Sequence, residues 1–97
     1  MTRTLYATMH ALPGREESLL ALLRALAVDV REEAGCARFV VYTQAANPRA
    51  VHVEETYRDE QAFQAHIATD HCAAFNKAII PLVEGGGSAV VFLDLVC

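Results

Sequence analysis

Strand-like and helix-like patterns of hydrophobic residues alternate along this chain. Residues 3 to 11 alternate between apolar and polar side chains, which predicts a strand with one apolar face. After Pro13-Gly14, leucine and alanine recur at helical spacing over residues 15 to 34, and Gly35 follows them. This pattern predicts an amphipathic helix that ends near the glycine and whose apolar side needs a sheet to cover.

The middle of the chain carries a predicted hairpin. Residues 36 to 46 are rich in aromatic and β-branched side chains, which favour a second strand. Asn47-Pro48 is a turn signal, and residues 50 to 58 predict a third strand beyond it. Because the connection is short, we expect the two strands to be paired neighbours.

The last third of the chain is predicted to be helical and then extended. Asp59 supplies a side-chain oxygen of the kind that caps a helix, here one that runs to about Thr69. Thr69-Asp70 can begin a second helical piece, which the glycines at residues 85 to 87 stop. Residues 89 to 96 then predict a final strand with apolar side chains on both faces.

This order of elements predicts a ferredoxin-like α+β fold, a split βαβ (βαββαβ) antiparallel sheet with its helices on one face. No repeat, low-complexity segment or linker interrupts the chain, so residues 1–97 are treated as a single domain. The sheet face away from the helices is expected to be apolar, with Val40, Tyr42, Phe92 and Val96 on it. Since 54% of the residues are hydrophobic, more than a small monomer easily buries, we expect a homodimer packed sheet to sheet.

Charge and composition exclude several classes of partner. The net charge is −4, with a single lysine and no basic cluster, so nucleic-acid binding is not expected. No apolar run approaches the roughly 20 residues that span a bilayer, and the N-terminus lacks the layout of a signal peptide, so we expect a cytoplasmic protein without a membrane partner. Three widely spaced cysteines without a C-x-x-C pair indicate neither a disulfide framework nor a zinc cluster.

Candidate chemistry is concentrated around the third predicted strand and the helix after it. Glu55 and Tyr57 are two residues apart, so an extended segment projects both from one face. His66 shares an apolar helical stripe with Phe63, an environment that can tune an imidazole for proton transfer near neutral pH, and His71 follows closely. Two alternatives stay open: His66 as an ordinary core residue, and Glu55 as a partner for backbone donors or an arginine.

The sequence contains no motif for a nucleotide cofactor, neither a glycine-rich dinucleotide turn nor a phosphate loop. His66 and His71 are five residues apart, whereas two ligands on one helix are three or four apart, and no third ligand is evident. We therefore predict no metal. A small pocket lined by aromatic and aliphatic side chains with one carboxylate suits a small oxygenated substrate from which a proton is removed.

The stretch from Val53 to His71, with Phe75 and Leu82 after it, resembles the antibiotic-biosynthesis and quinol monooxygenase family. The family pattern is Glu-x-aromatic-x-Asp, an apolar pair, His, then Thr-Pro-His and a phenylalanine. Here Tyr57 stands where the family usually has Trp, and Asp70 stands in place of the proline. The likeness extends over nearly the whole chain.

The resemblance implies a dimeric α/β barrel that oxidises a small quinol, phenolic or polyketide-like substrate with O2, without flavin or metal. It implies that His66 is the general base or proton shuttle, that Glu55 orients it or holds a substrate hydroxyl, and that His71 is a second polar group of the pocket. The remaining pocket residues would be Tyr57, Tyr42 and Phe75.

Two other functions remain open at this stage. Residues 55 to 62 also resemble the branch that isomerises the phosphorylated autoinducer-2 signal, which would need cations such as Arg38, Arg58 or Lys77. A small ferredoxin-like dimer can also bind a ligand without turnover. Heme degradation is disfavoured, because Asn76 and Ala7 stand where that branch of the family carries a histidine and an asparagine.

Overall fold

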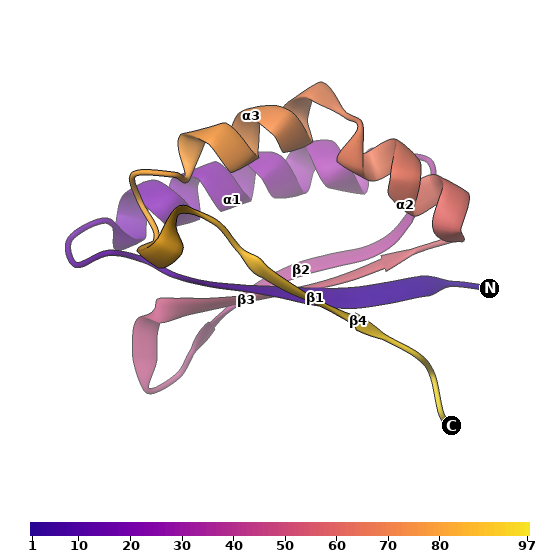
Figure 1. Ribbon diagram of the computed structural model, residues 1–97, viewed down its shortest axis with the longest axis horizontal. Helices are drawn as coiled ribbons and strands as arrows, with labels where there is room; N and C mark the ends of the chain where they lie inside the picture. The colour runs from indigo at the N-terminus through magenta and orange to yellow at the C-terminus, as the bar shows by residue number, and fades with distance from the viewer.

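A computed structural model describes all 97 residues and confirms the ferredoxin-like α+β fold. The elements are β1 (Arg3–His10), α1 (Glu16–Arg31), β2 (Cys36–Gln44), β3 (Asn47–Tyr57), α2 (Glu60–Ile67), α3 (Asp70–Ala78), a short 3-10 helix (Glu84–Gly86) and β4 (Ala89–Leu93). The four strands form one antiparallel sheet in the order β2-β3-β1-β4, and the helices cover one face of it (Figure 1).

The core lies between the helices and the inward side chains of the central strands. In the pairing of β1 with β3, Ala7 lies opposite Val53 and Met9 opposite Val51, and all four are buried. Across an antiparallel pair such neighbours share a face, so they form a continuous apolar floor. Helix α1 covers this floor with five buried side chains, namely Leu19, Leu23, Leu26, Ala27 and Val30.

Two side-chain caps divide the second helical region into α2 and α3, as the sequence predicts. The Asp59 carboxylate accepts a hydrogen bond from the backbone N–H of Ala62 at 2.8 Å, which begins α2. The Thr69 hydroxyl accepts from the N–H of Cys72 at 3.3 Å and donates to the carbonyl of His66 at 2.7 Å. Thr69 therefore ends one helix and starts the next, and the two helices are free to point in different directions.

The hairpin between β2 and β3 is tighter than predicted. Gln44 pairs with Asn47, so Ala45 and Ala46 alone form the turn, and Asn47-Pro48 begins β3 instead of forming the turn. The Asn47 side chain accepts a hydrogen bond from the N–H of Arg49 at 3.2 Å, and a proline is tolerated at the first residues of a strand.

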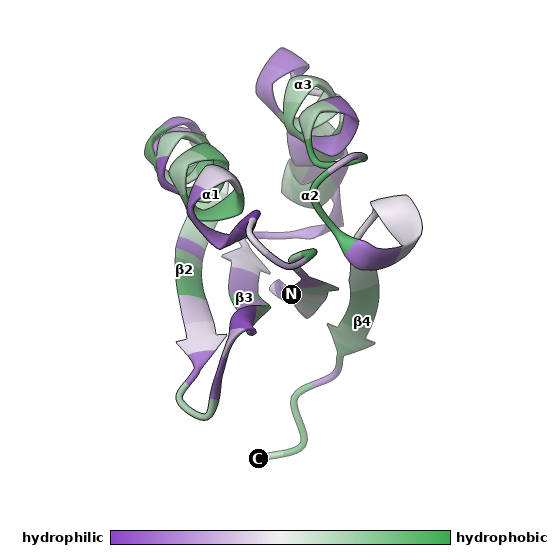
Figure 2. Ribbon diagram, turned by 90° about the vertical axis from the view of Figure 1, so that its left-hand side faces the viewer, coloured by the Kyte–Doolittle hydropathy of each residue, from purple (hydrophilic) through white to green (hydrophobic).

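The face assigned to Phe92 was wrong. Phe92 pairs with Leu5, and Val90 with Ala7, so both lie on the helix-covered face, where the Phe92 ring meets Phe63 edge-on at 5.4 Å. The outward side chains of β4 are Ala89, Val91 and Leu93. Figure 2 shows β4 as hydrophobic along its length.

Other predicted boundaries were too long. Helix α1 ends at Arg31 rather than residue 34, and β4 ends at Leu93, so Val96 lies beyond the sheet and is exposed. None of the helices is long and apolar enough to cross a membrane.

A glycine is needed at position 35 because two segments approach each other closely there, and not because a helix ends there. It lies in the turn before β2, and its carbonyl accepts a hydrogen bond from the N–H of Arg58 at 2.8 Å. A Cβ on Gly35 would overlap the Cβ of Ala62 on α2. The turn after α1 and the helix α2 can therefore pack together only because this position has no side chain.

Gly35→Ala is expected to destabilise the protein by about 1–3 kcal/mol, because the added methyl group forces α2 away from the turn. Ala62→Gly removes the atom that clashes. It should therefore lower the free energy of unfolding less in the Gly35→Ala background than in the wild type. Denaturant unfolding of the two single variants and the double variant measures this difference. Additive effects of the two changes would contradict the steric account.

Candidate active site

The structure brings His66 of α2 together with Glu55 and Tyr57 of β3. The Tyr57 hydroxyl donates a hydrogen bond to Oε1 of Glu55 at 2.7 Å, and Nε2 of His66 lies 3.6 Å from the same oxygen. The rings of Tyr57 and His66 pack with centroids 4.7 Å apart. All three residues are buried, so this is a polar cluster inside the protein and not a surface ion pair.

A second carboxylate, Glu33, completes the cluster and was missed by the sequence reasoning. It lies in the turn after α1, and its oxygens are 3.0 and 3.1 Å from Nδ1 of His66 and 2.7 Å from Nε2 of His71. One signal could have indicated it: negative charge at the C-terminal end of a helix is unfavourable, so an acid there needs a cationic or hydrogen-bonding partner. The partners themselves, 33 and 38 residues further along the chain, carry no local mark.

Burial sets the protonation of the two side chains on β3. Burial raises the pKa of the Glu55 carboxyl, an effect that the hydrogen bond from Tyr57 and the nearby His66 only partly oppose. Burial also raises the pKa of the Tyr57 phenol far above its usual value, and the Glu55 carboxylate raises it further. Tyr57 therefore stays protonated as a hydrogen-bond donor, and a base must come from elsewhere in the cluster.

Glu55 and His66 line a cavity of about 130 Å³ between the sheet and the helices. Most of its wall is apolar: Leu5, Ala7, Met9, Leu23, Leu26, Phe39, Val53, Phe63, Ile67, Phe75 and Val90. Cys72, Asn76 and Ser88 also line it. Burial raises the pKa of the Cys72 thiol, which therefore stays neutral near pH 7. The chemistry available inside the cavity is that of one carboxyl and one imidazole.

The other predicted site residues are placed differently. Phe75 lines the cavity, whereas His71 is more exposed and lies behind His66, in contact with Glu33. Tyr57 reaches the cavity only through Glu55 and His66, which it contacts. Tyr42 lies on the outer face of the sheet, where its hydroxyl accepts a hydrogen bond from Arg38 at 3.1 Å.

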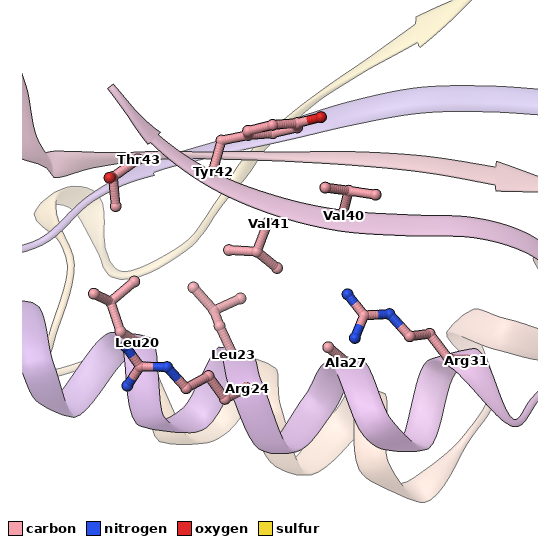
Figure 3. Close-up of a pocket in the computed structure, with 9 residues that line it drawn as sticks. All are labelled: Leu20, Leu23, Arg24, Ala27, Arg31, Val40, Val41, Tyr42 and Thr43. Atoms are coloured by element: carbon pink, nitrogen blue, oxygen red, sulfur yellow. The ribbon is translucent and has the colours of Figure 1, made fainter. Parts of the chain in front are cut away.

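A larger hollow of about 420 Å³ lies between α1 and β2 (Figure 3). Figure 3 shows Val41 pointing toward Leu23 on α1, while Tyr42 lies on the other side of the strand. Two arginines, Arg24 and Arg31, flank the hollow, but no carboxylate or imidazole lines it. We therefore place the candidate active site in the smaller cavity, where groups that can move a proton meet apolar walls.

Fold and site together define a small ferredoxin-like protein with a buried carboxylate–imidazole pocket. A family model described as antibiotic biosynthesis monooxygenase matches residues 2–78, and the chain belongs to this family. Membership of this family supports a monooxygenase-like function in general terms. No curated protein sequence matches the chain significantly.

Several crystal structures share the fold over nearly the whole chain. PA3566 from Pseudomonas aeruginosa is 29% identical, with a TM-score of 0.91 over 99% of this chain and 95% of its own. SO0527 from Shewanella oneidensis is 31% identical, with a TM-score of 0.87 over 95% of this chain and 88% of its own. A structure named antibiotic biosynthesis monooxygenase is 24% identical, with a TM-score of 0.90 over the full length of both chains, and supports the fold.

Glu55→Gln is expected to gain stability relative to the wild type as the pH rises. In the unfolded chain the carboxyl ionises near its ordinary pKa of 4.5, but in the folded protein it stays protonated to higher pH. The wild type therefore loses stability between these two pKa values, whereas a glutamine does not ionise. Denaturant unfolding at a series of pH values from 4 to about 8 measures the difference in free energy of unfolding between the variant and the wild type. If the variant instead lost stability relative to the wild type with rising pH, the folded protein would favour the ionised carboxylate.

Proposed function

We propose that this protein is a cofactor-independent monooxygenase that acts on a small quinol, phenolic or polyketide-like substrate. The observation that carries the proposal is the position of His66 and Glu55 in the wall of an otherwise apolar cavity. Removal of a proton from a phenol or quinol there leaves an electron-rich anion shielded from water, the form that reacts with O2. Family membership supports the same class of reaction.

In this proposal His66 is the general base. The Glu33 carboxylate accepts the hydrogen on Nδ1, which leaves the lone pair of Nε2 on the side of Glu55 and the cavity. Such a carboxylate fixes the tautomer and the orientation of an imidazole base. Glu33 is thus the positioning residue for His66, a role that the sequence analysis gives to Glu55.

Glu55 would then hold the substrate. Its Oε1 already accepts the hydrogen bond from Tyr57, and Oε2 is left for a hydroxyl or carbonyl oxygen of the ligand. Because burial raises its pKa, a fraction of Glu55 is neutral and can donate a hydrogen bond to an anionic substrate oxygen.

The reaction balances without an added reductant when the substrate is a quinol. The quinol supplies four electrons, one oxygen atom of O2 enters the ring, and the other leaves as water, so the product is a hydroxylated quinone. The cavity of about 130 Å³ is smaller than the roughly 300 Å³ at which drug-sized ligand sites begin, which favours a single-ring substrate.

A phosphorylated keto or enol substrate fits this cavity poorly. No lysine or arginine lines it, although a phosphoryl group needs cationic donors. Arg38 is paired with Glu54 at 2.9 Å on the outer face, and Arg58 lies 3.6 Å from Asp59. An isomerase of the autoinducer-2 type is therefore not favoured by any contact in the site.

Oxygen uptake by the purified protein over a panel of quinols and polyphenols, with a chelator present, tests the proposal. His66→Ala should lower the rate by about 10²–10⁴-fold, because the general base is lost. His66→Gln, which keeps the volume of the side chain, should be equally inactive, and its melting temperature should stay within a few degrees of the wild type.

His10→Ala is the matched control, since His10 is exposed at the end of β1 and points to the face opposite that of Met9, which lines the cavity. Its rate should equal that of the wild type. Ligand binding without oxygen uptake would instead assign the protein a binding role without turnover.

We also propose that the protein forms a homodimer through the outer face of the sheet. Val91 and Leu93 on β4 are 42% and 43% exposed there, and Tyr42 on β2 is 44% exposed. Between them the Tyr6 ring stacks on His52 with centroids 5.0 Å apart. Half-exposed aromatic and aliphatic side chains spread over one face of a sheet are typical of a surface that pairs with a second copy.

Light scattering should give the wild type a mass of twice 10.6 kDa. Val91→Asp places a charge on the outer face, on the edge strand β4, and should produce a monomer. Val28→Asp, at an exposed position of α1, is the control and should remain dimeric. A monomeric wild type, or dissociation by both variants alike, would contradict pairing through this face.

A further inference from the structure

We propose that Glu33, His66 and His71 form a binding site for a zinc ion. Each residue offers one ligand atom, and the three atoms lie within 4.8 Å of one another. They are a Glu33 carboxylate oxygen, Nδ1 of His66 and Nε2 of His71. Two imidazoles and a carboxylate are a ligand set that zinc sites in proteins use, with water in the fourth position.

The distances between the ligand atoms suit a divalent ion after small adjustments. Zinc lies about 2.0–2.2 Å from nitrogen and oxygen ligands, so tetrahedral ligand atoms are roughly 3.4 Å apart. In the structure the Glu33 carboxylate is 3.0 Å from Nδ1 of His66 and 2.7 Å from Nε2 of His71. The three atoms lie within 4.8 Å of one another, so an ion between them needs the two imidazole nitrogens to be drawn toward one centre and the carboxylate to move slightly away from each of them.

The arrangement of α2 and α3 removes the objection that the sequence raises to metal binding. The rule of three or four residues between ligands applies to a single helix, but Thr69 ends α2 and begins α3. His66 and His71 therefore belong to different helices and converge from two directions. The third ligand, Glu33, comes from the turn that Gly35 allows to pack against α2.

A second carboxylate lies where it supports such a site. Once Nδ1 of His66 binds a metal, its hydrogen must be on Nε2, and Oε1 of Glu55 lies 3.6 Å from that nitrogen. A carboxylate that accepts the free N–H of a metal-bound histidine fixes the ring and strengthens the ligand. The Glu55 carboxylate is itself held by the Tyr57 hydroxyl at 2.7 Å.

The site is accessible from the side away from the cavity. The side chains of His71 and Glu33 are 27% and 14% exposed, whereas that of His66 is 7% exposed. Neither Glu33 nor His71 lines the cavity that Glu55 and His66 share. An ion would enter from solvent and lie behind His66, separate from the substrate cavity.

One consequence rests on the proposed function. With Nδ1 bound to zinc and the hydrogen on Nε2, His66 has no lone pair with which to accept a proton. Zinc would therefore inhibit oxygen uptake, and a chelator would restore it. Binding itself is measured without any turnover, so the zinc site can fail or hold independently of the monooxygenase proposal.

The test is calorimetric titration of the chelator-treated protein with Zn²⁺, in a Cys97→Ser background that removes the exposed thiol. We expect one ion per chain, and no binding of Mg²⁺, which prefers a set of oxygen ligands. His71→Ala should weaken zinc binding by more than about 100-fold, because loss of a direct ligand exceeds the 10–100-fold loss typical of its supporting residues. Glu33→Gln should have a similar effect while its side chain keeps a hydrogen-bond acceptor for the imidazoles.

His52→Ala is the matched control. His52 also lies beside a carboxylate, 3.5 Å from Oε1 of Glu54, but on the outer face and without a third ligand. It should leave zinc affinity unchanged. Co²⁺ as a spectroscopic substitute should show visible bands of a four-coordinate site without thiolate charge transfer. No zinc binding, a thiolate band, or unchanged affinity in His71→Ala would overturn the proposal.

Discussion

The polar interior of this protein depends on one buried carboxyl group, that of Glu55. A carboxylate placed against an apolar core costs several kcal/mol unless it gains partners or a proton. Glu55 obtains both: Tyr57 donates a hydrogen bond to it, and burial raises its pKa so that the neutral form persists to higher pH. The positions of the neighbouring polar groups follow from this requirement.

A line of polar contacts runs from the core to the surface as a result. It begins at Tyr57, continues through Glu55 and His66 to Glu33, and ends at His71, whose side chain is partly exposed. Four separate segments contribute to it, namely β3, the turn after α1, α2 and α3. Such a connected set is sensitive to loss of any member, because the partners left behind are buried and unpaired.

Local rules explain what the sequence predicts correctly. The alternation of β1 and β3 places Glu55 and Tyr57 on the covered face, and short polar side chains at Asp59 and Thr69 mark the helix starts. These features depend on neighbours within a few residues, so a single sequence contains them. The grouping of Glu55, Tyr57 and His66 follows directly, because the strand leads into the helix.

Features that depend on distant parts of the chain could not be predicted. Glu33 meets its histidines only after α1 has crossed the sheet, and its place just after a helix indicates that the acid needs a partner without indicating which one. Phe92 was placed on the wrong face because a strand that is apolar on both sides has no alternation to orient it, and only the pairing of Phe92 with Leu5 decides. Tyr42 lies opposite His52 on the outer face, as the predicted sheet implies, and this placement is what keeps it out of the cavity that the family resemblance assigns it to.

The tight turn at Ala45 and Ala46 has an evolutionary consequence for the far end of β3. The hairpin already carries one irregularity beside this turn, between Thr43 and Gln44. Side chains of a strand alternate between faces, so inserting or deleting one residue in the turn would either carry Glu55 and Tyr57 to the outer face or have to be absorbed by a change in that irregularity. A change of two residues would keep both on the inner face. Among descendants of this chain, turn lengths of even difference can retain the buried carboxyl, while odd differences must be compensated within the hairpin.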